Sequence, residues 1–428
     1  MDIGGAVQQG GSGPQAYLGL LVFLGVAYAL CESRRAVRFK PVLWAVLTQA
    51  LLAVIISRVP AVRSTFMLLS HAIGEIKSAT LEGTSFVFGY VGGAEAPFVV
   101  QAPERQFVFA AQALPMVMVV SALSMLLFHW RVLPAVVRAF SVVLRRTLHI
   151  GGALGVCAAA KTFLGQTEAP LLIRPYLKDL TRSELFSVMT LGMATTSASV
   201  MVLYASFLEG VVPHPISHIL TASIISVPAA IALSRLMIPQ DGPDTEGSLE
   251  PPYKFSGAME AVSTGATDGM KLFINIIAML VVMLALVALT NRCLGVAEIG
   301  GAPLSLQRIL GILMSPLAWL MGIPWHEAQI AGNLIGTKVA LNEVMAFLEL
   351  SKAGSQALSD SSRLIMLYAL CGFANLSSVG IQIGGIGTMV PERRAEIINL
   401  GMRSLLAGTL ASCMSGTIMG IVSQWTGV

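Results

Sequence analysis

Residues 151–177, GGALGVCAAAKTFLGQTEAPLLIRPYL, decide the fold of this chain. An apolar leg from Gly151 to Leu164 meets the polar tip 165–168 (GQTE), and a second leg runs past Pro170 to Leu177. A helix rises about 1.5 Å per residue, so a leg of about twelve residues reaches about 18 Å, roughly half of a ~30 Å hydrocarbon core. The stretch therefore predicts a re-entrant helical hairpin that turns inside the membrane.

The second half of the chain repeats this pattern. A leg from Pro324 to Val339 leads to a polar tip at Asn342 and Glu343, and another leg runs from Val344 to Leu350. Each hairpin precedes an apolar span that small polar residues interrupt, at 194–199 (ATTSAS) and 373–378 (FANLSS). Paired broken segments in corresponding halves are typical of transporters with a midplane binding site. Because unwound backbone at membrane depth must be buried or line a wet cavity, we expect the two tips to face one another.

The composition places the whole chain in a membrane, because 55% of its residues are hydrophobic and only 12% are charged. Its apolar runs lack the alternation of a lipid-facing β-barrel, so we expect an all-α polytopic membrane protein with about eight transmembrane helices. The predicted spans are Tyr17–Cys31, Val42–Ser57, Phe107–Trp130, Glu184–Leu208, His218–Met237, Leu272–Thr290, Leu364–Gly387 and Met402–Val422.

Residues 1–428 are expected to form a single integral membrane domain. Its parts are N-terminal helices with an interfacial helix (1–145), a first hairpin and broken-helix repeat (146–240), a linker and scaffold helix (241–304), and a second hairpin and broken-helix repeat (305–428). The interfacial helix is predicted at 60–77, a second amphipathic stretch at 132–149, and a solvated acidic loop at 239–252, because apolar residues keep to one face of the first two and turn residues fill the third.

Two carboxylates, Glu168 and Glu343, stand at the predicted tips. A charged side chain at the bilayer centre costs at least about 2.5–3.5 kcal/mol, so it needs a partner. One interpretation is that both accept hydrogen bonds from substrate hydroxyl or N–H groups. The alternative is an ion pair with Lys161 or Lys338 that only holds the hairpins together.

Neutral polar side chains surround these carboxylates at Gln166, Thr167, Asn375 and Ser378. Such donors and acceptors suit a ligand with many polar edges and no net charge, for which a sugar joined to a heterocycle is a model. Phe373 either packs on a ring of the ligand or is an ordinary core aromatic. Another neutral polar solute could pair with the same donors and acceptors.

Other classes of protein are disfavoured. The formal charge of +4 is accounted for by loop Lys and Arg residues that set topology, so no nucleic-acid partner is expected. The sequence has no GxSxG, HExxH or Walker A pattern and no metal-ligand spacing, so we expect neither an enzyme nor a metal site. No appended soluble domain points to a receptor, and paired hairpins suit alternating access better than a channel.

The motifs resemble those of the concentrative nucleoside transporter family. The resemblance is carried by FLGQTEAPLLIRPY (163–176), LFSVMTLGMAT (185–195), MGIPW (321–325), LIGTK (334–338) with Asn342-Glu343, and CGFANLSSVG (371–380). It implies inverted repeats, a homotrimer in the bacterial inner (plasma) membrane, and an elevator-type motion of a hairpin-bearing transport domain against a scaffold. It also implies nucleobase contacts at Gly165, Gln166, Thr167, Glu168 and Val200, and ribose contacts at Glu343, Phe373, Asn375 and Ser378.

The coupling ion is where the sequence departs from the sodium-coupled relatives. The resemblance implies an ion site at positions 161, 164, 195 and 196, here Lys161, Leu164, Thr195 and Thr196, where those relatives have an Asn at the first position. A charged Lys offers three donors and no acceptor, so it cannot coordinate a cation. We expect sodium-independent transport, coupled to protons or driven by the nucleoside gradient, with Lys161 as a tethered charge.

Two points about coupling stay open. If Lys161 turned away, sodium would still bind backbone carbonyls and the protein would be a sodium symporter. Glu168 or Glu343 is a candidate proton carrier, because burial favours the protonated form of a carboxylate. No other cofactor is expected, and the preference between purine and pyrimidine nucleosides is not decided by these residues.

Overall fold

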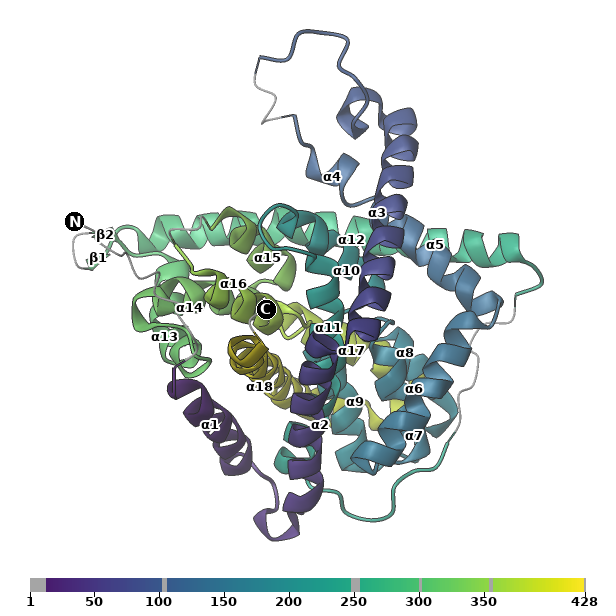
Figure 1. Cartoon of the computed structure of the whole chain (residues 1–428), viewed down its shortest axis with the longest axis vertical. Helices are drawn as coiled ribbons and strands as arrows, with labels where there is room; N and C mark the ends of the chain where they lie inside the picture. The colour runs from purple at the N-terminus through teal and green to yellow at the C-terminus, as the bar shows by residue number, and fades with distance from the viewer. Residues whose placement is uncertain (1–12, 102–105, 248–254, 300–301, 354–356, 427–428) are drawn as a thin grey trace.

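In the computed structural model, which describes residues 13–101, 106–247, 255–299, 302–353 and 357–426 and no side chains at 60–73, 279, 283, 299, 302 and 426, the chain is almost entirely helical. The predicted all-α membrane fold is confirmed (Figure 1). The one small addition in the described part is an antiparallel pair of two-residue strands, β1 (Glu298–Ile299) and β2 (Ala302–Pro303).

Six helical segments of the described part are long and apolar enough to cross a membrane, or eight if each of two bent helix pairs is one span. The six are α2 (Phe39–Arg58), α4 with α5 (Phe109–Gln112, Met116–His129), α9 with α10 (Arg182–Ala194, Ala198–Leu208), α11 (Pro215–Met237), α12 (Ala258–Leu294) and α18 (Arg394–Thr426). Two predicted spans are not among these six: the first forms the shorter helix α1 (Gln15–Ala29), and the seventh is divided into α16 (Asp360–Leu370) and α17 (Leu376–Met389).

The two halves repeat one order of elements. Amphipathic α6 (Val132–Leu148) bends by 120° into α7 (Gly152–Lys161), and α13 (Leu306–Leu320) bends by 117° into α14 (Trp325–Ala340). A polar tip, a short returning leg, a broken helix and a long helix (α11 or α18) follow each bend. The predicted second leg at 344–350 is α15 (Glu343–Lys352), whereas α13 was not predicted as an element.

Two predicted elements differ from the structure. The second leg of the first hairpin is one turn, α8 (Glu168–Leu171), followed by the 3-10 turn η4 (Arg174–Tyr176), because Pro170 and Pro175 lack the N–H groups that would extend a regular helix. The interfacial helix predicted at 60–77 is part of α3 (Pro60–Phe88), a helix of 29 residues, and the side chains of residues 60–73 lie outside the described residues.

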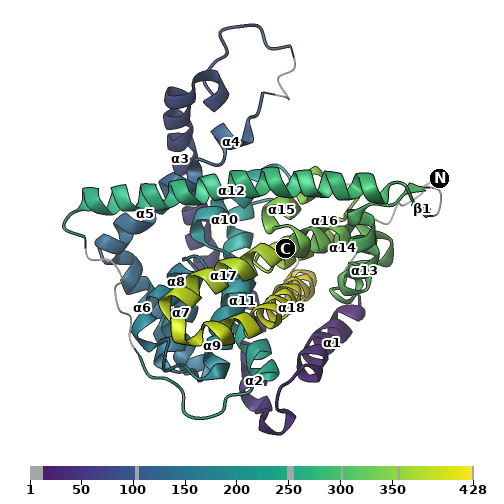
Figure 2. The same ribbon diagram turned by 180° about the vertical axis from the view of Figure 1, so that it is seen from behind.

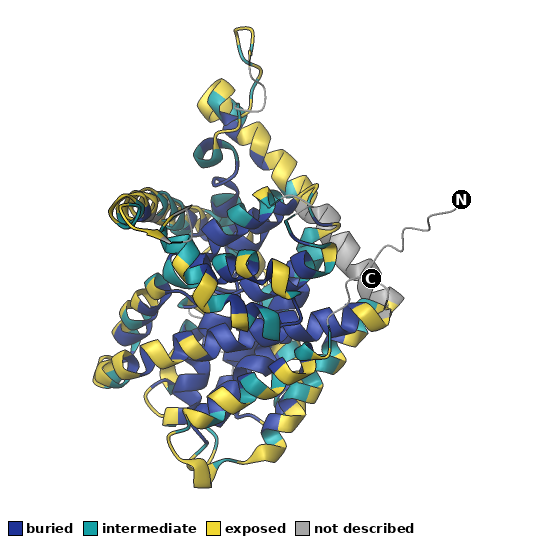
Figure 3. Ribbon diagram, turned by 90° about the vertical axis from the view of Figure 1, so that its left-hand side faces the viewer, coloured by how far each residue is buried: buried dark blue, intermediate teal, exposed yellow. Residues whose placement is uncertain are grey.

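Burial divides the helices into a core and a rim. The best-buried apolar windows lie in α9–α10, α11 and α18, where 89%, 83% and 94% of residues are buried, against 6% in α12 (Figure 3). α12 is a long straight helix that crosses the molecule and packs mainly along α5, and α3 and α4 project beyond it (Figure 2). An apolar helix this exposed requires lipid or another protein against it.

The loop after α11 is anchored to α9, α11 and the first hairpin, while residues 241–243 and 246 of its described part, 239–247, are exposed, in agreement with the predicted solvated loop. Glu184 accepts hydrogen bonds from Thr245, from the backbone N–H at 2.8 Å and the hydroxyl at 2.7 Å. Asp244 pairs with Arg235 at 2.9 Å. The carbonyl of Thr245 accepts from the N–H of Ala153 at 3.3 Å, which fixes the start of α7.

Candidate functional site

The breaks in the two broken helices lie against each other. α9 ends at Ala194, and Thr195 and Ser197 take extended conformations before α10 begins. The other break lies between α16 and α17, where a methyl group added to Gly372 would stand 2.8 Å from the carbonyl oxygen of Ala194. This approach is closer than side chains tolerate, so the two breaks meet backbone to backbone.

Both hairpin tips and both breaks line one cavity of about 190 Å³. The nine residues predicted to contact substrate all line it: Gly165, Gln166, Thr167, Glu168, Val200, Glu343, Phe373, Asn375 and Ser378. The expectation that the two tips face one another is confirmed. In the described structure, the polar side chains of both repeats therefore surround one cavity.

Glu343 is held at the start of α15 by two donors from different elements. The phenol of Tyr204 in α10 donates to Oε1 at 2.8 Å, and the amide of Asn375 donates to Oε2 at 2.6 Å. The Tyr204 ring stacks on Phe347 of α15, with centroids 4.5 Å apart. Two lone-pair positions of the carboxylate remain for further donors.

Glu168 is held more loosely. Its side chain is exposed to the cavity and accepts one hydrogen bond, from the N–H of Gly165 at 3.0 Å. Within the described residues no ion pair joins either carboxylate to Lys161 or Lys338. Lys338 instead donates to the carbonyl of Ala369 and to Ser412, both at 2.8 Å. The interpretation that these carboxylates serve only as ion-pair partners is not supported.

The side-chain amides of Asn375 and Gln166 differ in how many of their hydrogen-bonding groups already have partners. Asn375 caps α17, where its Oδ1 accepts from the N–H of Ser378 at 2.8 Å and from Ser377 at 2.7 Å, and its Nδ2 donates to Glu343. One N–H of Asn375 remains. The Oε1 of Gln166 is buried and has no hydrogen-bond partner among the described residues.

Lys161 lies inside the first hairpin and does not turn away from it. Its ammonium is fully buried, donates to the carbonyl of Leu164 at 3.2 Å and stands 5.0 Å from the centroid of the Phe373 ring. Thr195 donates to the carbonyl of Leu191 at 2.9 Å and meets that of Lys161 at 3.4 Å. Thr196 contacts the thiol of Cys371 at 3.7 Å. The ammonium of Lys161 thus occupies the carbonyl oxygen of Leu164 inside the hairpin.

Sequence reasoning missed the wall that α12 contributes to the cavity. Leu272, Ile276 and Leu280 line it at helical spacing, together with the exposed amide of Asn275. The apolar residues carry no signal, because cavity-facing and lipid-facing positions of such a helix look alike. Asn275 is a signal that could have been read, since an amide in so apolar a span needs a polar environment.

Family models match nearly the whole chain. Models described as the C-terminus and the N-terminus of Na+ dependent nucleoside transporters match residues 218–420 and 18–91. A model described as nucleoside recognition matches residues 110–210, which contain the first hairpin and first broken helix.

Individual proteins agree with these models. An uncharacterized transporter of Haemophilus influenzae is 36% identical, over 94% of this chain and 96% of the relative. The nucleoside permease NupC of Helicobacter pylori is 34% identical, over 94% of this chain and 96% of that protein. The solved structure of CNTnw in an inward-facing substrate-bound state is 33% identical and superposes with a TM-score of 0.88, over 97% of this chain and 98% of that one.

Proposed function

This chain belongs to the concentrative nucleoside transporter family, and we propose that it carries nucleosides across its membrane by secondary active transport. The observation that carries the proposal is the single cavity lined by all nine predicted contact residues from both repeats. A nucleoside has hydroxyl and amide edges and no net charge, so neutral amides, hydroxyls and two carboxylate acceptors satisfy it without an opposite charge.

The two tips are proposed to divide the substrate between them. Gln166, Thr167 and Glu168, with Gly165 and Val200, face the nucleobase. Glu343 and Ser378, with Phe373 and Asn375, face the ribose, where the carboxylate accepts from sugar hydroxyls. Hydrogen bonds to a charged acceptor are worth about 1.5–3 kcal/mol each, enough to define the orientation of the substrate.

Alternating access is proposed to be an elevator-type motion. The hairpins and broken helices move as a transport domain, and α12 with α5 forms the scaffold. The apolar stripe of Leu272, Ile276 and Leu280 supports this role, because a polar solute slides past an apolar wall without binding to it. The exposed apolar surface of α12 is proposed to face lipid or the other subunits of a homotrimer in a bacterial inner membrane.

For coupling, we propose sodium-independent transport driven by protons, with Lys161 in the place of a bound cation. The contacts of its ammonium with Leu164 and the Phe373 ring support this proposal. Glu168 is proposed as the proton carrier rather than Glu343, because both oxygens of Glu343 already accept hydrogen bonds, from Tyr204 and Asn375, whereas Glu168 accepts one. The rival is sodium coupling through backbone carbonyls alone.

Uptake by the purified protein in liposomes tests both parts. Labelled uridine and adenosine are competed with unlabelled nucleosides, free bases and an amino sugar, and competition by nucleosides alone is the expected result. Competition by the amino sugar alone would favour another neutral solute. The same liposomes in sodium or choline buffer, with and without a protonophore, decide coupling: strict sodium dependence would refute the role of Lys161.

A further inference from the structure

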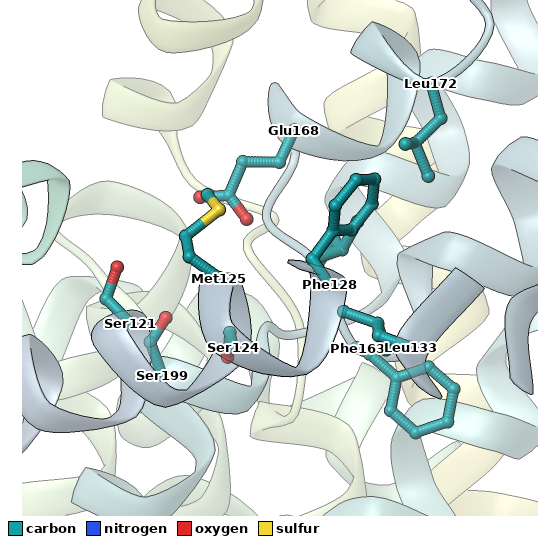
Figure 4. Close-up of a pocket in the computed structure, with 10 residues that line it drawn as sticks. Ser121, Ser124, Met125, Phe128, Leu133, Phe163, Glu168, Leu172 and Ser199 are labelled. Atoms are coloured by element: carbon teal, nitrogen blue, oxygen red, sulfur yellow. The ribbon is translucent and has the colours of Figure 1, made fainter. Parts of the chain in front are cut away.

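A second, smaller cavity lies behind the first hairpin tip. It has a volume of about 30 Å³ and lies between α5, the hairpin and the start of α10. Its apolar side is formed by Phe128, Leu133, Phe163 and Leu172, and the hydroxyls of Ser121 and Ser199 lie on the opposite side, with Glu168 and Met125 between them (Figure 4). Ser124 and Leu164 complete the lining.

Water fits this compartment in both size and chemistry. A site needs about 10–15 Å³ for one water molecule, so 30 Å³ holds about two. A buried water needs two to four polar partners, and the hydroxyls of Ser121 and Ser199 and the carboxylate of Glu168 supply them, whereas the hydroxyl of Ser124 donates to the carbonyl of Val120. A nucleoside is far too large for this space.

Glu168 lines both cavities, so this one residue borders the small compartment and the nucleoside cavity. A second link runs through α10, where the hydroxyl of Ser199 lies 3.0 Å from that of Ser197, and Ser197 lines the nucleoside cavity. Glu168 can therefore contact water in the small compartment while substrate occupies the nucleoside cavity. Its loose anchoring by a single backbone N–H leaves lone pairs free on that side.

We propose that this compartment is a proton-entry site, through which a water molecule delivers a proton to Glu168 without crossing the nucleoside cavity. In the transfer an O–H bond of hydronium breaks, a carboxyl O–H bond forms at Glu168, and neutral water remains. The inference rests on the proton coupling proposed above, and adds the route and its serines.

The charges around Glu168 suit such an exchange. α5, α6 and α10 contribute no charged residue to the compartment. Lys161 belongs to the same hairpin as Glu168, and Glu343 lines the nucleoside cavity together with Glu168. Protonation of Glu168 therefore weakens its attraction to Lys161 and its repulsion from Glu343. Protonation of Glu168 and the electrostatic field in the nucleoside cavity are thus linked.

Removing the three hydroxyls in S121A/S124A/S199A tests the route, with S206A as the matched control. Ser206 is also in α10, but its hydroxyl donates to the carbonyl of Leu203 and it lines neither cavity. Proton-driven uptake of uridine and adenosine is measured against external pH, beside exchange of labelled for unlabelled nucleoside without any gradient. We expect uptake to fall about tenfold or more and its pH optimum to move to lower pH, while exchange and S206A stay near wild type.

Each other outcome is decisive. Wild-type proton-driven uptake in the triple variant overturns the entry route, and so does an equal loss of uptake and exchange, which would mean damage to the site. Should the triple variant not fold, S121L, which fills the compartment, is measured in the same way and must show the same split. If the native protein shows no proton dependence, the proposed coupling itself is wrong, which is distinct from failure of the route.

Discussion

The phenol of Tyr204 donates a hydrogen bond of 2.8 Å to the carboxylate of Glu343, joining the first repeat to the tip of the second hairpin. Both residues are buried, and the Tyr204 ring stacks on Phe347 one turn along α15. The orientation of the proposed ribose acceptor is therefore set by a residue that does not line the cavity itself.

The variant Y204F should weaken nucleoside recognition without blocking the transport cycle. Loss of a hydrogen bond to a charged group costs about 1.5–3 kcal/mol, so the KM for uridine should rise roughly 10- to 100-fold with a smaller change in maximal rate. The increase should be smaller for 3′-deoxyuridine, which gives Glu343 one hydroxyl fewer to hold. Y368F is the control, because that buried hydroxyl pairs with His218 at 3.2 Å. Equal KM changes in both variants would contradict a specific role for Tyr204.

The variant G372A should separate the two helix breaks. Its new methyl group would meet the carbonyls of Ala194 and Met193 at 2.8 and 2.9 Å, and backbone on both sides cannot yield cheaply. We expect a loss of stability of about 1–3 kcal/mol and a fall in uptake. G380A in α17, where nothing lies within 4 Å of the added methyl, should remain near wild type. Thermal unfolding in detergent and uptake measure the two effects, and wild-type behaviour of G372A would show that the breaks need no close contact.

Much of the site was predictable because polarity is expensive inside a membrane. Glu168, Gln166, Glu343 and Asn375 stand out from apolar surroundings, so their gathering at one place follows from sequence and is confirmed by the shared cavity. The half-depth hairpins were readable for the same reason, since legs of this length cannot span.

The remainder depends on packing that no local pattern contains. The amphipathic helix α13 was missed because the residues that it buries, Gly311, Ser315 and Ala318, are small and carry no apolar pattern, and they become buried only in the bent pair with α14. Tyr204 reads as an ordinary core aromatic until α15 brings Glu343 to its hydroxyl. The irregular α8–η4 leg follows from Pro170 and Pro175, a signal that was present but was outweighed by its apolar composition.

The variant K161N should make uptake respond to sodium. It removes the ammonium that donates to Leu164 and replaces it with an amide oxygen, the type of ligand that a hard cation accepts. K161M removes the charge without supplying an oxygen and serves as the control. We expect sodium-stimulated nucleoside uptake in K161N alone. Sodium stimulation in the native protein, or in K161M to the same degree, would show that Lys161 does not stand in for the ion.

A charge cluster at the start of α9 should make the stability of the fold depend on acid. Glu32, in the loop after α1, accepts from Arg182 at 2.9 and 3.1 Å and also pairs with Arg403 of α18. The hydrogen bond from Arg182 holds the pKa of Glu32 below its usual value of 4.5, although partial burial acts in the opposite direction. A carboxylate with a lowered pKa stabilises the folded state above its unfolded pKa, and that contribution is lost as the pH falls through the folded pKa.

The variant E32Q should therefore unfold at a lower temperature than the native protein at pH 7, and the difference should shrink once the pH falls below about 4.5. Half-exposed arginines keep the effect modest. E392Q, at an exposed position for which the described structure has no ion pair, should show no such dependence. Thermal midpoints in detergent between pH 3 and 8 provide the measurement. A constant difference across that range would mean that Glu32 stabilises the fold by packing, because only its ionised form can hold Arg182 and Arg403.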